Sequence, residues 1–384
     1  MTTPKHTIED LISNLGQTLP QVSPEELSSG DELSNVVLFD LREPELMRAG
    51  ALPGARAVGQ RFIELELAQQ AIARDAPIVL YCQAGRQSLL ALRGLQDLGY
   101  SNARSLVGGF SAWSSRGLPV EQPVMLTDPE RSRYARHLSL PRVGEPGQLL
   151  LKKARVAVVG TGGLGAPIAY YLAAAGVGTL RLIDHDVVDA SNLQRQILFD
   201  TASVGAPKVE VARKRLSEFN PLVALEVRNE MLDTGNAARL LEGVDIVVDG
   251  SDNFETRYAV NQAVLAHRQT LVSASVFQFS GQVYSFAPHL GTPCYACLFP
   301  EAAPDSLAPS CSASGVVGAL AGTVGMLQVM EVLNIILQIG SPLFGRMLTY
   351  NGLKAETRQL SFDVNPSCPA CQPIRGGSTE VPAG

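Results

Sequence analysis

A cluster of four glycines constrains this chain more than any other feature, and it consists of Gly160, Gly162, Gly163 and Gly165. Before it, residues 156–159 have the length and β-branched character of a buried parallel strand. After it, residues 166–175 have an alanine-rich helix pattern, and a second strand pattern at 179–183 ends on Asp184. Strand, glycine turn, helix, strand and acid predict a nucleotide-binding unit. We expect Gly162 and Gly163 to bring the backbone close to a phosphate, and Asp184 to accept hydrogen bonds from ribose hydroxyls.

Two basic residues indicate which nucleotide binds. Arg195 follows Asp184 in the sequence SNLQRQ at 191–196, and Lys208 begins the next helix pattern. Two fixed cations near the mouth of the site suit a triphosphate better than a hydride donor. The chain has no G-x-x-x-x-G-K-[ST] sequence, which excludes a P-loop ATPase. The glycine spacing alone also fits an NAD-dependent oxidoreductase, which is the alternative.

An acid and an amide, Asp252 and Asn253, follow a later buried strand pattern at 245–249. Strands and helices alternate throughout this part of the chain, which predicts a doubly wound α/β sheet with ligands at the carboxyl ends of its strands. A carboxylate at a phosphate site is a suitable magnesium ligand, so we expect Asp252 to bind Mg²⁺. Asp252 is also suited to cap the helix that the pattern begins at Glu255, and the two roles are compatible.

Four cysteines form two C-x-x-C pairs, Cys294 with Cys297 and Cys368 with Cys371. Together they supply four thiolates for a tetrahedral, closed, structural Zn²⁺ site. Because the gap between the pairs is long, the site would tie the C-terminal segment back to its domain. A redox function explains one C-x-x-C pair but does not explain two.

A fifth cysteine, Cys82, ends an apolar strand pattern at 78–81 and precedes Gly85, Arg86 and a helix pattern at 88–98. The N–H groups of such a loop and of the helix N-terminus are expected to converge on the sulfur and stabilise its anion, and Arg86 adds positive charge. We therefore expect Cys82 to be a reactive thiol. The alternative is a buried structural cysteine.

The second part of the chain resembles the MoeB/ThiF/HesA enzymes, which are bacterial relatives of the ubiquitin-activating E1 proteins. The resemblance rests on GTGGLGAP at 160–167, DHD at 184–186, SNLQRQ at 191–196, GAPKVE at 205–210 and DGSDN at 249–253. It implies an enzyme that uses ATP to adenylate the C-terminal glycine of a small ubiquitin-like sulfur carrier protein. It assigns ATP binding to Gly162, Gly163, Asp184, Ser191, Asn192, Leu193, Gln194, Arg195, Lys208, Asp252 and Asn253, and to Arg136 reaching across a homodimer.

The first part of the chain resembles a single-domain rhodanese, through DLRE at 40–43, GALPGA at 50–55, the Cys82 loop and GGFSAW at 108–113. This implies that Cys82 carries a persulfide. The loop has glutamines where arginine is frequent, which disfavours small anionic sulfur donors and leaves a protein donor such as a cysteine desulfurase open. In E1-like enzymes a cysteine at the place of Cys311 can attack the activated carboxylate or take part in sulfur transfer, and a bystander is the alternative. The expected catalytic residues are Cys82, Cys311, Arg195, Lys208 and Asp252.

The two resemblances predict a rhodanese-like α/β domain at 1–123 and a Rossmann-like adenylyltransferase domain at 129–375. A linker at 124–128 joins them, and a disordered tail at 376–384 follows. The favoured carrier is of the MoaD type, which serves molybdopterin biosynthesis, and a ThiS-type carrier for thiamin or another carrier is the alternative. Two further alternatives are a first domain that only docks partners, and a HesA-type adenylase that uses amine nucleophiles.

The charge and the hydropathy of the chain restrict which partners and which cellular location we expect. The net charge of −6 argues against nucleic acid or an anionic membrane as the main partner. The N-terminus lacks the apolar core of a signal peptide, so we expect a cytoplasmic protein. The most apolar segment, 316–339, carries Gln328, Glu331, Asn334 and Gln338 at helical spacing. Because one face is polar, we expect a buried or dimer-facing helix and no membrane span.

Overall fold

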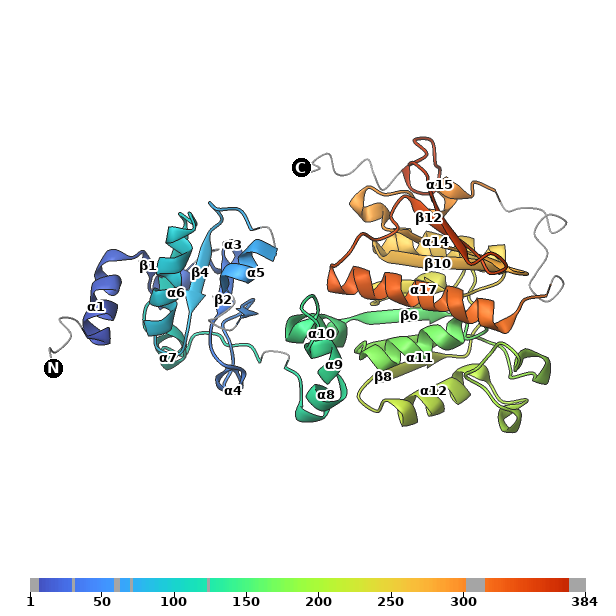
Figure 1. Cartoon of the computed structure of the whole chain (residues 1–384), viewed down its shortest axis with the longest axis horizontal. Helices are drawn as coiled ribbons and strands as arrows, with labels where there is room; N and C mark the ends of the chain where they lie inside the picture. Colours follow the sequence, from blue (N-terminus) through green and yellow to red (C-terminus); the bar gives the residue numbers. More distant parts are fainter. Residues whose placement is uncertain are drawn as a thin grey trace. The chain divides into compact units, whose positions relative to one another are not determined.

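The computed structural model describes residues 7–29, 32–58, 63–69, 72–122, 125–301 and 315–372. The chain forms two compact units, Met1–Met125 and Leu126–Gly384 (Figure 1). Each unit has its own β-sheet and its own buried core. The expected end of the second domain at 375 and the tail at 376–384 lie outside the described residues.

The first unit is built on a parallel sheet of five strands in the order β1-β5-β4-β2-β3. The strands are β1 (Gln21–Val22), β2 (Val37–Asp40), β3 (Arg56–Ala57), β4 (Ile78–Tyr81) and β5 (Ala103–Leu106). The helices are α1 (Ile8–Thr18), α2 (Pro24–Ser28), α3 (Glu32–Asn35), α4 (Pro44–Met47), α5 (Ile63–Gln69), α6 (Arg86–Asp97) and α7 (Gly109–Ser115). All four residues of the central strand β4 are buried, and Cys82 follows at its carboxyl end, as predicted.

The second unit is built on a sheet of eight strands in the order β13-β12-β11-β10-β9-β6-β7-β8. The strands are β6 (Arg155–Val159), β7 (Thr179–Ile183), β8 (Ala224–Arg228), β9 (Ile246–Asp249), β10 (Thr270–Phe277), β11 (Ser280–Phe286), β12 (Arg346–Asn351) and β13 (Glu356–Ser361). The helices are α8 (Asp128–Arg133), α9 (Ala135–Leu138), α10 (Gly144–Lys153), α11 (Gly165–Ala175), α12 (Lys208–Phe219), α13 (Ala237–Leu241), α14 (Phe254–His267), α15 (Tyr295–Leu298) and α17 (Gly318–Leu337).

The strand order of the second unit determines where a ligand can bind. The chain runs from β6 outward to β7 and β8, and then returns to place β9 on the other side of β6. This reversal is the switch point at which open α/β sheets bind ligands. Alternate residues of β6 pack on opposite faces, against α11, α12 and α17 on one side and against α13 and α14 on the other. The predicted α/β class is confirmed.

The half of this sheet beyond β10 was not predicted. From β10 to β13 every neighbouring pair of strands is antiparallel, so the sheet is mixed. The β10–β11 hairpin turns at Gln278, which has a φ of +50°. The pairs β10–β11 and β12–β13 are hairpins with short connections, whereas the chain between β11 and β12 contains α15 and α17.

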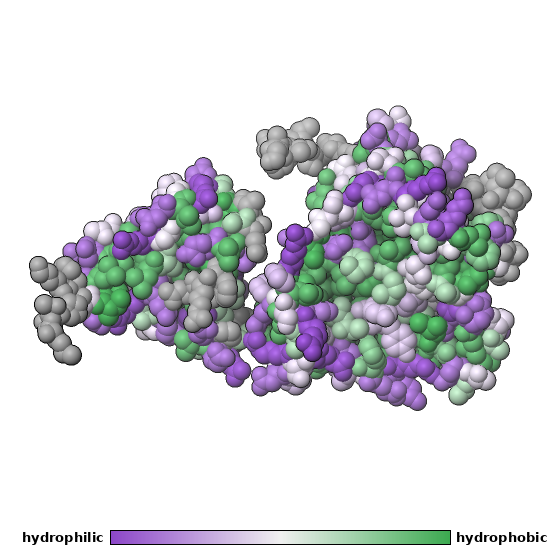
Figure 2. Space-filling view, viewed as in Figure 1, coloured by the Kyte–Doolittle hydropathy of each residue, from purple (hydrophilic) through white to green (hydrophobic). Residues whose placement is uncertain are grey.

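Part of the polar face of helix α17 is buried. Gln328 and Glu331 are buried against the sheet, where Gln328 donates to the Asp249 carbonyl at 3.0 Å and Glu331 accepts from Ser285 Oγ at 2.7 Å. Met330 is 53% exposed. Figure 2 shows apolar and weakly polar atoms where α17 and α11 lie in Figure 1. Gln328 and Glu331 therefore serve the interior, whereas Asn334 is half-buried and Gln338 is exposed.

By length and composition, α17 is the one helix in the described part of the chain that could cross a membrane. Half of its most apolar stretch is buried inside the protein, and core helices pass the same test.

Candidate active site

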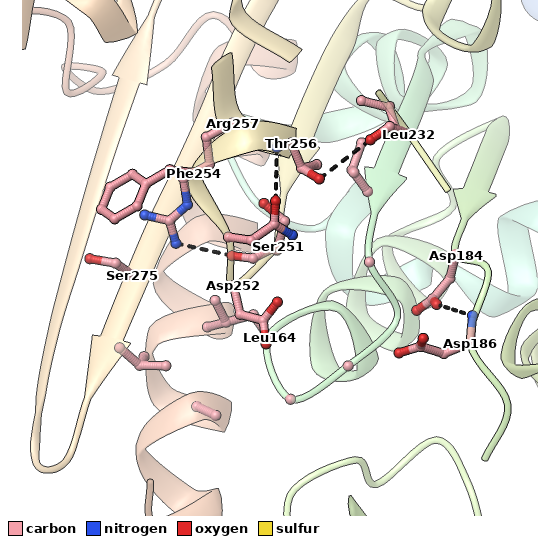
Figure 3. A pocket seen from close by; sticks show the side chains of 18 of the residues that line it. Leu164, Asp184, Asp186, Leu232, Ser251, Asp252, Phe254, Thr256, Arg257 and Ser275 are labelled. Carbon is pink, nitrogen blue, oxygen red and sulfur yellow. Dashed lines mark hydrogen bonds between the residues drawn. The ribbon is translucent and has the colours of Figure 1, made fainter. Parts of the chain in front are cut away.

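A cavity of about 610 Å³ opens at the carboxyl ends of β6, β7 and β9 and extends along the β10–β11 hairpin (Figure 3). It therefore lies at the switch point of the sheet. The sequence-predicted residues that line it are Gly162, Gly163, Asp184, Asn192, Arg195, Lys208, Asp252 and Asn253. These residues come from five separate segments of the chain, and the fold brings them together.

The glycine turn forms one wall of the cavity. Gly160 has a φ of +82°, and a Cβ on Gly165 would lie 1.9 Å from the Gly160 carbonyl oxygen. Only glycine permits this close packing of α11 against the end of β6. Gly162 and Gly163 follow the turn and present bare backbone to the cavity just before the helix begins. A helix N-terminus with free N–H groups is a suitable place for a phosphate.

Asp184 is held in one orientation by three hydrogen bonds. Its Oδ2 accepts from the N–H and the hydroxyl of Thr161, both at 2.8 Å, and its Oδ1 accepts from Asp186 N at 2.9 Å. Figure 3 shows the bond to Asp186. A carboxylate has about four acceptor positions, so one remains for a ribose hydroxyl.

Lys208 is buried, but its charge is already paired. Its Nζ donates to Asp186 Oδ2 at 2.7 Å, and Asp186 is 52% exposed. A polyphosphate in the cavity would compete with this exposed carboxylate for the ammonium group. Arg195 is half-buried, and its Nη2 donates to Asn192 Oδ1 at 2.7 Å. Both cations therefore lie at the cavity with fixed positions, as the sequence predicted.

The sequence left both helix capping and metal binding open for Asp252, and the structure gives the capping role to Asn253. Asn253, not Asp252, caps α14, because its Oδ1 accepts from Thr256 N at 2.8 Å. The helix begins at Phe254, one residue earlier than expected. The capping role expected for Asp252 is therefore wrong. Asp252 is exposed at the cavity, and its carboxylate has no hydrogen-bond partner among the described residues.

Four predicted ATP ligands do not line this cavity. Ser191 donates to Asp189 Oδ1 at 2.6 Å and shapes the turn, while Leu193 packs on the core. The Gln194 carbonyl packs against Gly318, and a Cβ on Gly318 would lie 2.2 Å from the Gln194 carbonyl oxygen. Arg136 is exposed on α9, away from the cavity lining.

The sequence reasoning left the role of one lining residue, Arg257, open. Its guanidinium lies at the cavity wall, where Nη2 donates to the carbonyls of Ser251 at 3.0 Å and Ala274 at 3.2 Å. Burial acts to lower the pKa of Arg257, but Tyr284 and Asp249 outweigh this and raise it. Arg257 is thus a permanent buried cation. Its side of the cavity is completed by aromatic residues that no motif marks: Phe254, Phe277, Tyr284, Tyr295 and Phe299.

The two C-x-x-C pairs meet, as predicted. Neighbouring sulfurs are 3.8 Å apart for Cys294 and Cys297, 3.7 Å for Cys294 and Cys368, and 3.5 Å for Cys297 and Cys371. Four sulfurs placed tetrahedrally at about 2.3 Å from a zinc ion lie about 3.8 Å apart. Burial raises the pKa of Cys294 to about 12, while backbone N–H groups outweigh burial and lower that of Cys297 to about 7. The cluster could hold a zinc ion.

The first unit contains the Cys82 loop. Cys82 is 2% exposed. Phe110 N donates to the Cys82 carbonyl at 2.9 Å, and Ser111 N donates to the Gln83 carbonyl at 3.0 Å. The first N–H groups of α7 therefore hold the loop backbone. Among the described residues, the hydrogen-bond partner of the Cys82 sulfur is the hydroxyl of Ser88. Cys311 lies outside the described residues.

The fold and the cavity define a nucleotide-binding α/β enzyme with a separate cysteine-loop unit. The ThiF family matches residues 134–370, and the rhodanese-like domain matches residues 23–116. The chain belongs to the ThiF family. The predicted family and the predicted enzyme class, an adenylyltransferase with a sulfurtransferase domain, are confirmed.

Two relatives and one solved structure show the extent of the similarity. The chain is 47% identical over 251 residues to the sulfur carrier protein adenylyltransferase of Thermus thermophilus, covering 64% of this chain and 92% of that protein. It is 42% identical over 261 residues to the probable adenylyltransferase/sulfurtransferase MoeZ of Mycobacterium tuberculosis, covering 66% of each chain. The crystal structure of E. coli MccB with ATP has a TM-score of 0.54 at 23% identity, over 64% of this chain and 75% of that one. This structure supports the fold alone.

Proposed function

We propose that this protein adenylates the C-terminal glycine of a small ubiquitin-like sulfur carrier of the MoaD type, and then converts it to a thiocarboxylate with sulfur from Cys82. One observation carries the proposal. Two fixed cations, Arg195 and Lys208, and the unpartnered carboxylate of Asp252 surround bare backbone at Gly162 and Gly163. The same chain carries a rhodanese-like unit with Cys82 in its loop.

The first step activates the carrier. A carboxylate does not exchange oxygen for sulfur unaided, because oxide is a poor leaving group. A carboxylate oxygen of the carrier attacks the α-phosphorus of ATP, the bond to the β-phosphate oxygen breaks, and pyrophosphate leaves. Positioning and cations opposite the phosphates lower this barrier. Arg195 and Lys208 supply these cations, and Asp184 orients the ribose.

A divalent cation fits this arrangement. Asp252 offers a hard carboxylate with no hydrogen-bond partner among the described residues, which is the donor type that Mg²⁺ takes at a phosphate site. Mg²⁺ bound there would neutralise phosphate charge. The four-cysteine cluster would hold a structural Zn²⁺, since four thiolates leave no open position for chemistry.

The second step transfers sulfur. The terminal sulfur of a Cys82 persulfide attacks the adenylated carbonyl carbon, and AMP leaves, which gives an acyl disulfide. A second thiol, for which we propose Cys311, attacks the Cys82 sulfur of that disulfide. The carrier thiocarboxylate leaves and a Cys82–Cys311 disulfide forms, which an external thiol reduces. A cysteine desulfurase would reload the persulfide.

The proposal includes an assembly and a location. We propose a cytoplasmic homodimer in which Arg136 of one chain reaches the phosphates bound by the other. The carriers of the ThiS type are the alternative substrates. Membership in the ThiF family favours adenylation over the NAD-dependent alternative.

The test is ATP–pyrophosphate exchange with the purified protein, alone and with MoaD-type and ThiS-type carriers added one at a time. Exchange that requires the MoaD-type carrier supports the proposal, and exchange only with another carrier overturns the choice of carrier. In parallel, a Cys82→Ala variant is expected to keep exchange and lose thiocarboxylate, which mass spectrometry of the carrier detects. Undiminished thiocarboxylate in this variant would overturn the role of Cys82.

A further inference from the structure

The sulfur of Cys82 has one hydrogen-bond partner among the described residues, and this partner is a hydroxyl. Ser88 Oγ lies 3.6 Å from Cys82 Sγ. Ser88 is the third residue of α6, so the helix that follows the loop folds back to place it beside the sulfur. Ser88 is fully buried, and Cys82 is nearly so. The contact is therefore shielded from water, where a hydrogen bond is electrostatically stronger.

A second buried hydroxyl fixes the direction of this contact. Ser105, on the neighbouring strand β5, is also fully buried, and its Oγ donates to Ser88 Oγ at 2.8 Å. A hydroxyl has a single donor hydrogen. Because the Ser88 oxygen accepts from Ser105, its own hydrogen is left for the sulfur. Once the sulfur is an anion it can only accept, so the order is Ser105 to Ser88 to Cys82.

We propose that Ser88 donates the hydrogen bond that stabilises the anionic sulfur of Cys82, as a thiolate and as a persulfide, and that Ser105 is a positioning residue that orients the Ser88 hydroxyl. The biological meaning of this inference rests on the proposed role of Cys82 in sulfur transfer. The hydrogen bond itself can be tested without a carrier protein.

A neutral donor matters here because the loop carries little positive charge. Residues 82–87 include one basic residue, Arg86, and its Nη2 lies 3.4 Å from Glu9 Oε1. Both of these side chains are largely exposed, so solvent screens their field at the sulfur. The N–H groups of α7 are used by backbone carbonyls of the loop. The Ser88 hydroxyl is a buried group in direct contact with the sulfur.

The other charged and titratable groups around the loop are distinct from this pair of serines. Asp40 and Arg42 form a buried ion pair beside the central strand, and Tyr81 donates to Asp40 Oδ2 at 2.6 Å. Burial, together with the Asp40 charge, raises the pKa of Tyr81. The Arg86–Glu9 pair lies on α6 and α1. A substitution at Ser88 leaves all of these groups in place, so its effect on the sulfur reports the hydroxyl.

The experiment measures how fast iodoacetamide alkylates Cys82 in the full-length protein as a function of pH. Peptide mass spectrometry separates Cys82 from the other cysteines. A tenfold loss of the anionic form on removal of one hydrogen bond to the sulfur corresponds to a shift of about one pH unit. For Ser88→Ala we expect the half-maximal rate to move up by about one pH unit, with alkylation about tenfold slower below that midpoint. For Ser105→Ala we expect a smaller shift in the same direction.

Two further variants separate this effect from a loss of packing. Ser88→Ala alone leaves the buried Ser105 hydroxyl without its acceptor. The double variant Ser88→Ala/Ser105→Ala removes both hydroxyls, and we expect the same shift in its alkylation profile as for Ser88→Ala. The matched control is Ser111→Ala, because Ser111 Oγ accepts from Gln83 Nε2 at 3.0 Å and so contacts the loop without contacting the sulfur. We expect its alkylation profile to match the wild type.

An unshifted profile in Ser88→Ala, with or without a lower melting temperature, overturns the inference. An equal shift in Ser111→Ala also overturns it, because the effect would then come from the loop backbone. The proposed function is tested separately: undiminished thiocarboxylate production in Cys82→Ala would overturn the role of Cys82 without bearing on the hydrogen bond from Ser88. In Ser88→Ala we expect normal pyrophosphate exchange and about tenfold slower thiocarboxylate formation.

Discussion

At the scale of single residues, the acids of the cavity have different tasks. Asp184 accepts three hydrogen bonds from the protein, and Asp186 holds Lys208. Asp252 has no hydrogen-bond partner in the described chain, and the neighbouring Asn253 caps the helix in its place. The structure of the unit therefore does not depend on the Asp252 carboxylate. A charged group that the fold does not use is available for a ligand.

An Asp252→Asn variant tests this separation. We expect pyrophosphate exchange to fall about a hundredfold, because a charged contact at the reacting phosphates is lost. We expect stability to change by less than about 0.5 kcal/mol, since the carboxylate makes no hydrogen bond or ion pair with the described residues. Asn253→Ala is the contrast, with a loss of about 1 kcal/mol because the cap of α14 is removed. Wild-type exchange at every Mg²⁺ concentration in Asp252→Asn would contradict the role of this carboxylate.

The residues that the sequence predicted for the cavity and those that it missed differ in one physical respect. Gly162 and Asp184 follow the two strands of the β6-α11-β7 unit, and Lys208 begins the next helix, α12, so local pattern marks them as one site. Tyr284 and Tyr295 reach the cavity from the antiparallel hairpin and from α15. Their position depends on pairings between distant segments, and aromatic residues at such places look like ordinary core residues in a sequence.

At the scale of elements, the start of α8 shows how one side chain joins two helices. Glu130 accepts from Thr127 N at 2.6 Å, which caps α8, and from Lys152 Nζ of α10 at 2.7 Å. Glu130 is 5% exposed. Burial acts to raise its pKa, but the bonds from Lys152 and Thr127 outweigh burial and lower the pKa from its ordinary value of 4.5. The carboxylate form is therefore stabilised by folding.

We predict that Glu130→Gln lowers the free energy of unfolding by about 2 kcal/mol at neutral pH, because a charged acceptor is lost. The stabilisation from this carboxylate is present above pH 4.5 and is lost as the pH falls through its lower folded pKa. Urea unfolding between pH 3 and 7 should therefore show a shallower pH dependence in the variant.

The matched control is Glu145→Gln, which breaks the half-exposed pair with Arg131 and should cost less than about 1 kcal/mol. Equal pH dependence in wild type and Glu130→Gln would contradict the prediction.

Helix α17 shows the limit of sequence reasoning at this scale. Its helical character was predictable from length and composition, but the direction of its polar residues was not. Gln328 meets the carbonyl of Asp249, and Glu331 accepts from the hydroxyl of Ser285. These partners lie on strands far away in the sequence, and one of them is a backbone atom. A pattern of polar residues does not reveal whether its partner is water or a buried group.

At the scale of the whole molecule, local motifs were sufficient to predict both units. The mixed sheet, and the part of the cavity wall formed by the β10–β11 hairpin, could be found only from the structure. The cysteine cluster is the exception among long-range contacts. The C-x-x-C spacing is local, and two such pairs in one chain imply that they meet. Their meeting joins α15 to the segment that follows β13, 74 residues later in the chain.

We predict that the purified protein contains about one zinc ion per chain and that Cys368→Ser loses it. Because metal binding and folding are coupled in such sites, the variant should lose more than about 3 kcal/mol of stability. Atomic absorption gives the zinc content, and limited proteolysis should show early cleavage of the C-terminal segment. Cys82→Ser is the control and should keep its zinc. A zinc-free protein with full stability would contradict a structural metal site.

The last prediction concerns the covalent fusion of the two units. Each unit is compact with its own core, and the boundary falls at residues 125 and 126. In the proposed function, fusion makes sulfur delivery an intramolecular step, for which a short linker gives an effective concentration of about 1 mM. A protease site inserted at the boundary allows cleavage after folding. At about 1 μM protein, cleavage should slow thiocarboxylate formation at least about tenfold and make its rate depend on concentration. Pyrophosphate exchange should stay constant, since the nucleotide cavity lies within the second unit. A thiocarboxylate rate that is unchanged by cleavage and by dilution would show that sulfur delivery does not need the fusion.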